Sequence, residues 1–162
     1  MSYWEKFMEK IYDKKKIAAS IANSKYHALL DTLPLDFYLI KYEKGEFVSS
    51  PFRNESLFQI VEQGSVNIYF IRDDGTRYSL SSAAADYLLG DMDIFYHKDS
   101  NIFAEAGETL TCIVFPIEKH REILLSNAGF LEPQPCGQNR NHDYHGCRPV
   151  FPCGTGYVLH EV

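Results

Sequence analysis

The chain has 162 residues, of which 45% are hydrophobic and 14% aromatic, and its formal net charge at pH 7 is −6. This length accommodates one domain with a sizeable core plus appendages, because single cores commonly occupy about 100–150 residues. No apolar run approaches the roughly 20 residues of a membrane span, and the negative charge argues against nucleic-acid binding by this chain alone, since phosphate contacts need clustered Lys and Arg.

Residues 1–33 are predicted to form an N-terminal helical segment. Apolar residues recur there at helical spacing on two faces: Trp4, Phe7, Met8 and Ile11, then Ile17, Ile21, Leu29 and Leu30. This pattern predicts two helices or one bent helix, which Pro34 ends. The lysines at 14–16 are expected to form a solvated helix face rather than a phosphate or membrane contact. The N-terminus has no apolar stretch of the kind found in secretory signals, so we expect a cytoplasmic protein.

Residues 34–131 are predicted to form a β-rich domain with a closing helix. The β-prone runs cover residues 37–42, 47–48, 56–62, 65–72, 79–89 and 101–115. The dipeptides Gln63-Gly64 and Asp74-Gly75 supply the positive-φ residues that tight hairpins require. Seven or eight short strands of this kind predict a sandwich or jelly roll, whose core should include Leu110, Cys112 and Val114.

Helical spacing returns after Pro116, with Ile117, Ile123 and Leu124 as the apolar contacts. Glu118 is favourably placed in the first turn of this helix, close to the positive end of its dipole. The helix should end near Asn127, because residues 127–129, Asn-Ala-Gly, suit a left-handed C-terminal cap.

Residues 132–162 differ in kind from the rest of the chain. They hold four of the seven prolines, four of the ten glycines and three of the four cysteines, without a sustained period. Such a composition cannot bury enough apolar surface to offset the entropy of ordering, so we expect an irregular tail foreign to the domain. Its candidate metal ligands, Cys136, His142, His145, Cys147 and Cys153, lack the Cys-x₂-Cys spacing of a zinc knuckle, and we predict no metal site.

Several short motifs share an order over about 100 residues. They are Tyr-Glu-Lys-Gly-Glu at 42–46, Val-Glu-Gln-Gly-Ser-Val at 61–66, Asp-Gly at 74–75 and Gly-Asp-Met-Asp-Ile-Phe at 90–95, followed by a strand and helix at 112–125. This order resembles the effector domain of the CRP/FNR superfamily, the cyclic-AMP receptor protein and fumarate-nitrate regulator group of bacterial transcription factors. The resemblance implies a double-stranded β-helix, or jelly-roll barrel, of the cyclic-nucleotide-binding type.

The resemblance also locates an effector pocket. Family position assigns its lining to Leu80, Ser81, Gly90, Asp91, Met92, Asn101 and Ile102. In cyclic-nucleotide-binding members a glutamate binds the ribose and an arginine about ten residues later pairs with the phosphate, whereas this chain has Asp91 and Asn101 at those places. Burying an anion without a cationic partner costs several kcal/mol, so cyclic nucleotide binding is disfavoured. Asp91 has an alternative role as the N-cap of a short helix at 92–96, whose backbone N–H groups could meet another ligand.

The predicted function is effector sensing in a transcription regulator, without catalysis and without a cofactor. The effector is an unidentified small molecule, no membrane contact is expected, and DNA would be bound only through a domain absent from this chain. Loss of the family's dimerisation helix would weaken any homodimer. Two alternatives remain: a stand-alone ligand-binding or protein-interaction module, and a metal-dependent cupin enzyme, which the isolated residues His27, His97 and His120 support poorly.

The tail has a second interpretation, as the product of a reading-frame shift. Codons for residues 151–161 can be chosen so that, read one base later, they encode Phe-Leu-Ala-Glu-Arg-Val-Met-Phe-Tyr-Met, which is a helix-forming pattern. We therefore expect the coding DNA, when sequenced, to carry a dimerisation helix and a helix-turn-helix in the shifted frame. Stop codons in that frame would refute the shift and leave a genuine disordered tail.

Overall fold

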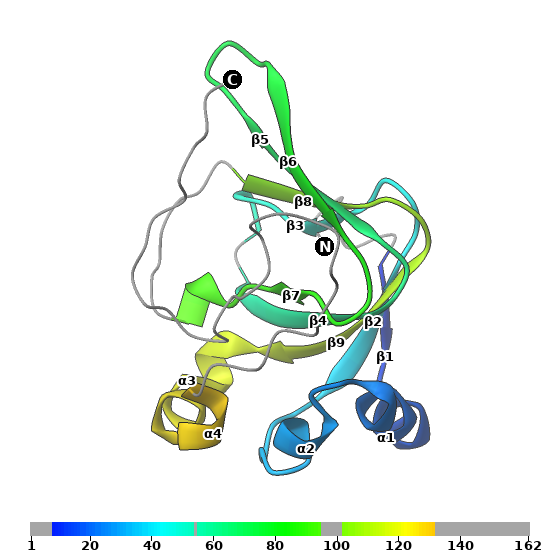
Figure 1. Ribbon diagram of the computed structural model, residues 1–162, viewed down its shortest axis with the longest axis vertical. Coiled ribbons are helices and arrows are strands. Elements are labelled where there is room, and N and C mark those ends of the chain that lie inside the picture. The colour runs from blue at the N-terminus through cyan, green and yellow to red at the C-terminus, as the bar shows by residue number, and fades with distance from the viewer. Residues whose placement is uncertain (1–7, 54, 95–101, 132–162) are drawn as a thin grey trace, which may run out of the picture. The chain divides into compact units, whose positions relative to one another are not determined.

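The computed structural model describes residues 8–53, 55–94 and 102–131. The chain divides into two compact units, residues 1–121 and residues 122–162. The first unit contains both β-sheets and the first two helices (Figure 1). The predictions for the tail fall on 132–162 and lie outside the described residues.

Two antiparallel sheets form the first unit. The five-stranded sheet has the order β1-β2-β9-β4-β7, formed by Glu9–Ile11, Tyr38–Tyr42, Leu110–Pro116, Leu57–Gln63 and Leu88–Leu89. The four-stranded sheet has the order β3-β8-β5-β6, formed by Phe47–Ser49, Ile102–Ala106, Val66–Ile71 and Arg77–Ala83. This arrangement is the predicted jelly roll, in which neighbouring strands come from distant parts of the chain.

The main core is built from alternate side chains of both sheets. It combines Ile40 and Tyr42 of β2 with Val66 and Ile68 of β5, and it includes the predicted core residues Leu110, Cys112 and Val114 of β9. Burial raises the pKa of the Cys112 thiol above its ordinary value, with a smaller contribution from the charge of Glu62. Cys112 is therefore an inert packing residue rather than a reactive thiol.

The opposite face of the five-stranded sheet is also buried. Phe58 and Ile60 of β4 and Ile113 and Phe115 of β9 point to this side, and the rings of Phe58 and Phe115 stack with centroids 4.8 Å apart. The helices α1 (Lys14–Asn23) and α2 (His27–Leu30) lie on the same side of the sheet (Figure 1). Burial on both faces explains why the sequence of β9 is almost continuously apolar.

The N-terminal prediction is wrong for residues 9–11. These residues form β1, which pairs with β2 in the register Glu9 to Lys41 and Ile11 to Leu39. A free backbone edge on β2 offers ladder hydrogen bonds, and these outweigh a local helical pattern of this length. Residues 1–7 lie outside the described residues.

Asp13 is the N-cap of helix α1. The Asp13 carboxylate accepts hydrogen bonds from the backbone N–H groups of Lys15 and Lys16 at 2.8 and 3.2 Å. These bonds satisfy two of the donors that a helix N-terminus leaves open. The lysines at 14–16 are exposed in the first turn, as predicted.

The helix pair is tied to the turn between β6 and β7 through Asp86. One Asp86 carboxylate oxygen accepts from the Lys25 backbone N–H at 3.2 Å and from the Ser24 hydroxyl at 3.4 Å, and the Tyr26 hydroxyl donates to the Asp86 carbonyl. Asp86 has φ +65°. A left-handed conformation is unfavourable for most side chains but is tolerated by aspartate, and these bonds hold it in place.

Helix α3 (Ile117–Ser126) begins and ends as predicted, and α4 (Ala128–Leu131) follows it after one residue. The predicted left-handed cap at 127–129 is wrong, because none of these residues has a positive φ. Instead the Asn127 side chain accepts a hydrogen bond from the Phe130 backbone N–H at 2.9 Å. Asn127 thus caps the start of α4, a use of asparagine that the sequence pattern does not distinguish from a C-cap.

Candidate functional site

The inner face of the four-stranded sheet brings together two of the predicted pocket residues. Ile68 of β5 lies opposite Ala104 of β8 and Ser81 of β6, and the next inward residue, Phe70, lies opposite Ile102 and Tyr78. Partners in an antiparallel register share a face. Ser81 and Ile102 therefore lie in adjacent rows of the surface that faces the core.

Leu80 is displaced from this pattern. The register of β5 with β6 shifts so that Ile68 pairs with Ser81 and Tyr69 with Ser79, which leaves Leu80 without a partner on β5. A bulge of this kind bends the strand and redirects a side chain. The Leu80 side chain is 37% exposed, as is consistent with this position.

Gly90 and Asp91 lie after β7, which belongs to the other sheet, and a 3₁₀ turn at Met92–Ile94 follows them. Gly90 has φ +82°, and a Cβ atom there would lie 2.1 Å from the Leu57 carbonyl oxygen. The absence of a side chain at Gly90 is thus required for packing against β4. A short helix is predicted at 92–96, and its described part is this turn at Met92–Ile94. Asn101 lies outside the described residues.

The 3₁₀ turn is held by Arg121 of α3. The Arg121 guanidinium donates to the carbonyl oxygens of Ile94 and Asp93 and pairs with Glu118 at 2.8 Å. These bonds satisfy carbonyls that a short turn leaves open. The sequence contains no sign of this role, since it shows only an arginine in the second turn of a helix.

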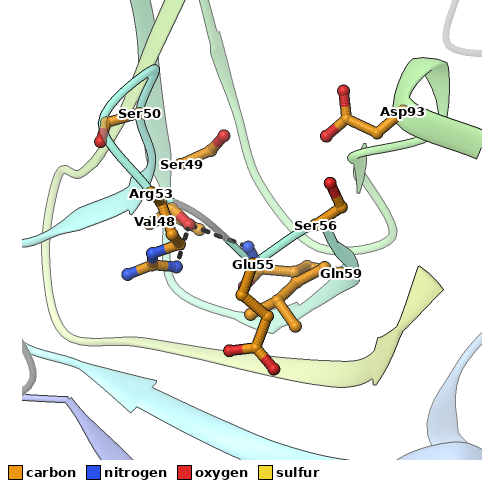
Figure 2. Close-up of a pocket in the computed structure, with 9 residues that line it drawn as sticks. Val48, Ser49, Ser50, Arg53, Glu55, Ser56, Gln59 and Asp93 are labelled. Atoms are coloured by element: carbon orange, nitrogen blue, oxygen red, sulfur yellow. Dashed lines mark hydrogen bonds between the residues drawn. The ribbon is translucent and has the colours of Figure 1, made fainter. Parts of the chain in front are cut away.

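A small polar pocket of about 50 Å³ lies between the end of β3, the start of β4 and the 3₁₀ turn. Its lining residues are Val48, Ser49, Ser50, Arg53, Glu55, Ser56, Leu57, Gln59 and Asp93. Figure 2 shows Arg53 and Asp93 on opposite sides of it. The pocket shares none of the seven predicted residues. Its size suits bound water rather than an effector, since ligand pockets usually have volumes of about 300 Å³ or more.

Arg53 and Gln59 form the polar floor of this pocket. Arg53 donates to the carbonyl oxygens of Val48 and Phe47 at 2.9 and 3.1 Å. The Gln59 side chain is buried, donates to the Val48 carbonyl at 2.9 Å, and accepts from the Tyr42 hydroxyl at 2.7 Å. The hydrogen bonds of Arg53 and Gln59 hold the connection between β3 and β4 in place (Figure 2).

Two arginines of the β5–β6 hairpin, Arg72 and Arg77, lie on opposite faces of the four-stranded sheet. On the outer face, the Arg77 guanidinium carbon lies 3.5 Å from the centroid of the Tyr69 ring. The Arg77 guanidinium also pairs with the Glu105 carboxylate at 3.5 Å. Arg72 lies over the Tyr78 ring, 4.4 Å from its centroid, next to the inward-facing residue Phe70. Arg72 is not among the residues predicted from the sequence, although the alternation from Phe70 places it on the inner face.

His120 is buried beside the start of β2. Its Nε2 accepts a hydrogen bond from the Asp36 backbone N–H at 3.2 Å, and a carboxylate oxygen of Asp36 lies 3.4 Å away. Burial lowers the pKa of His120 below 6.5, and the Asp36 charge opposes this shift only in part. The neutral imidazole is therefore the folded-state form near neutral pH.

This shift makes stability depend on pH. Between the folded-state pKa and 6.5 the unfolded chain binds more protons at His120, so the free energy of unfolding should fall as the pH drops below about 6.5. Urea unfolding at pH 7.5 and 5.5 measures the loss. His120→Gln, which retains a hydrogen-bond acceptor but does not titrate, should lose less stability over the same interval. Equal losses in both proteins would contradict the assignment.

Among the described residues, no helix has the length and apolar character required to cross a membrane. No protein-family model and no curated protein matches the sequence.

Solved structures with the same fold do match. The sensor domain of the transcriptional regulator DNR from Pseudomonas aeruginosa matches with a TM-score of 0.54 and 16% identity, over 71% of this chain and 79% of that one. The cAMP-bound PfPKA-R matches with a TM-score of 0.53 and 19% identity, over 68% of this chain. A regulatory subunit of a cAMP-independent protein kinase A from Trypanosoma brucei matches with a TM-score of 0.51 and 14% identity, over 65% of this chain.

These matches show that the chain has the jelly-roll fold of regulatory sensor domains, in agreement with the resemblance found in the sequence. The chain spans 42% of PfPKA-R and 44% of the Trypanosoma protein.

Proposed function

We propose that this chain is the effector-sensing part of a CRP/FNR-type transcriptional regulator, that it binds a small molecule other than a cyclic nucleotide, and that it has no catalytic activity. DNA binding belongs to a separate domain, and the protein acts in the cytoplasm. The fold alone supports only a sensor architecture, because one fold serves many functions.

The observation that carries the proposal is a change in burial along the inner face of the four-stranded sheet. Val66 and Ala106 are 0% and 1% exposed, whereas Ser81 and Ile102, farther along the same face, are partly exposed. Burial therefore decreases toward this end of the sheet. Ser81 and Ile102 are residues that the family resemblance assigns to the effector pocket.

Screening small metabolites against the ¹⁵N-labelled protein tests this proposal. A true effector should raise the melting temperature and shift the backbone amide resonances of Ser81 and Ile102. Because Lys16 lies in α1, on the far side of the five-stranded sheet (Figure 1), its amide should stay unchanged and serves as the internal reference. Binding that leaves Ser81 and Ile102 unaffected would reject the effector-pocket assignment.

Cyclic nucleotides are disfavoured because no arginine stands at the place of the family's phosphate partner. The sequence from Asp91 to Glu105 contains no arginine, and the guanidinium of Arg121 is engaged by Asp93, Ile94 and Glu118. A cyclic phosphate drawn from water needs a bidentate cationic partner. The same fold occurs in a cAMP-bound and in a cAMP-independent regulatory protein, so it does not imply a cyclic nucleotide.

We therefore expect cyclic AMP and cyclic GMP to leave the melting temperature unchanged at millimolar concentration. A ligand present at about 100 times its dissociation constant would add about 2.7 kcal/mol to the free energy of unfolding, which a thermal melt resolves easily. A cyclic-nucleotide-binding domain measured in parallel is the positive control. A clear rise in melting temperature would overturn this part of the proposal.

A further inference from the structure

The inner face of the four-stranded sheet ends in a row of large apolar side chains, Phe70, Tyr78 and Ile102, which we call the end row. Phe70 of β5 lies opposite Tyr78 of β6 and Ile102 of β8. The rings of Phe70 and Tyr78 stack with centroids 5.2 Å apart and planes 15° apart. The two rings and the Ile102 side chain thus form one continuous apolar wall.

The end row is only partly covered. Tyr78 is 39% exposed, and Phe70 and Ile102 are of intermediate exposure, whereas Ile68 in the preceding row is 8% exposed. Exposed apolar surface next to a buried core is unfavourable in water and gains free energy when a ligand covers it. The wall borders Ser81, so it adjoins the predicted effector position.

Arg72 supplies a positive charge at the edge of this wall. Its guanidinium lies 4.4 Å from the centroid of the Tyr78 ring. Its charge interacts with the Asp74 carboxylate in the adjoining turn, but within the described part of the chain it forms no ion pair, whereas Arg77 on the outer face is paired with Glu105. A guanidinium stacked on a ring keeps its N–H edge free to bind a carboxylate in a bidentate manner.

From this juxtaposition we infer that the end row and Arg72 bind a planar aromatic carboxylate. The ring packs against Phe70, Tyr78 and Ile102, and the carboxylate pairs with Arg72. Aromatic rings pack on other rings with favourable geometry, and the opposite charges fix the orientation of the ligand. The inference rests on the proposed function, because it names the chemical class of the effector.

Benzoate, phenylacetate and cinnamate are the probes, titrated into the full chain and followed by ¹⁵N-resolved NMR and thermal melts. We expect at least one of them to bind in the millimolar range or more tightly and to shift the amide resonances of Tyr78 and Ile102. Cyclohexanecarboxylate, which has the charge without a planar ring, and benzyl alcohol, which has the ring without the charge, should bind at least tenfold more weakly, since tenfold corresponds to about 1.4 kcal/mol.

Two pairs of variants separate this site from general effects. Arg72→Gln should weaken binding about tenfold or more through the lost charge-assisted pair, whereas Arg77→Gln removes the same charge from the outer face and should leave binding unchanged. Tyr78→Ser should abolish binding and Tyr78→Phe should retain it. All three positions lie at the hairpin, and unchanged melting temperatures without ligand establish that each of the four variants is folded.

The inference is overturned if none of the three aromatic carboxylates binds, or if Arg72→Gln and Arg77→Gln weaken binding equally. Its failure is distinguishable from that of the proposed function. A non-aromatic effector that shifts the amides of Ser81 and Ile102 would preserve the sensing role and reject the aromatic carboxylate.

Discussion

Replacing Gly90 or Gly64 with alanine is expected to destabilise the protein by about 2–5 kcal/mol, of which about 1–2 comes from the left-handed backbone and about 1–3 from overpacking. Both glycines have positive φ, +82° and +93°. A Cβ at Gly90 would lie 2.1 Å from the Leu57 carbonyl oxygen, and one at Gly64 would lie 2.4 Å from that of Thr109. These carbonyls lie in or next to paired strands, so they cannot move aside without disturbing ladder hydrogen bonds.

Gly75→Ala is the matched control. Gly75 has φ +82°, the same as Gly90, but no atom lies within 4 Å of the position of its Cβ. The variant should therefore show only the backbone contribution of about 1–2 kcal/mol. Urea unfolding followed by circular dichroism measures all three variants. If Gly75→Ala proves as damaging as Gly90→Ala, close packing against β4 is not the reason for the glycine at 90.

Gln59→Ala is expected to cost about 3–5 kcal/mol, through the cavity it leaves and the hydrogen bond that the buried Tyr42 hydroxyl loses. Gln59 is 2% exposed and Tyr42 is fully buried, and their 2.7 Å hydrogen bond lies inside the main core. The Tyr42 hydroxyl also interacts with the Arg53 side chain. The Val48 carbonyl keeps its bond from Arg53.

A double-mutant cycle isolates the hydrogen bond from the packing. Tyr42→Phe alone removes the hydrogen bond to the Gln59 side-chain oxygen and should lower the free energy of unfolding by about 1–3 kcal/mol. The other single variant of the cycle is Gln59→Leu. The double variant, Tyr42→Phe with Gln59→Leu, removes both polar groups and should cost less than the sum of the costs of these two single variants. Chemical unfolding of the four proteins gives the coupling energy. Strict additivity would show that the two side chains do not depend on each other.

The sequence by itself determined those parts of the fold whose causes are local. Runs of β-prone residues located β2, β5 and β9, and the positive-φ requirement of tight turns identified Gly64 and Gly75. The helical period after Pro116 located α3, because a proline residue and a change of period mark its boundary within a few residues. The order of the motifs along the chain then led to the jelly roll.

Only the tertiary structure decided features that depend on distant partners. Residues 9–11 are a strand because the edge of β2, some 30 residues away in the sequence, offers backbone hydrogen bonds. The bulge at Leu80 arises from the pairing of β6 with β5. The contact of Arg72 with Tyr78 crosses a hairpin, and the bond of Tyr42 to Gln59 joins two strands separated by β9 in the sheet. None of these is encoded in local periodicity, since each follows from which backbones and side chains the fold brings together.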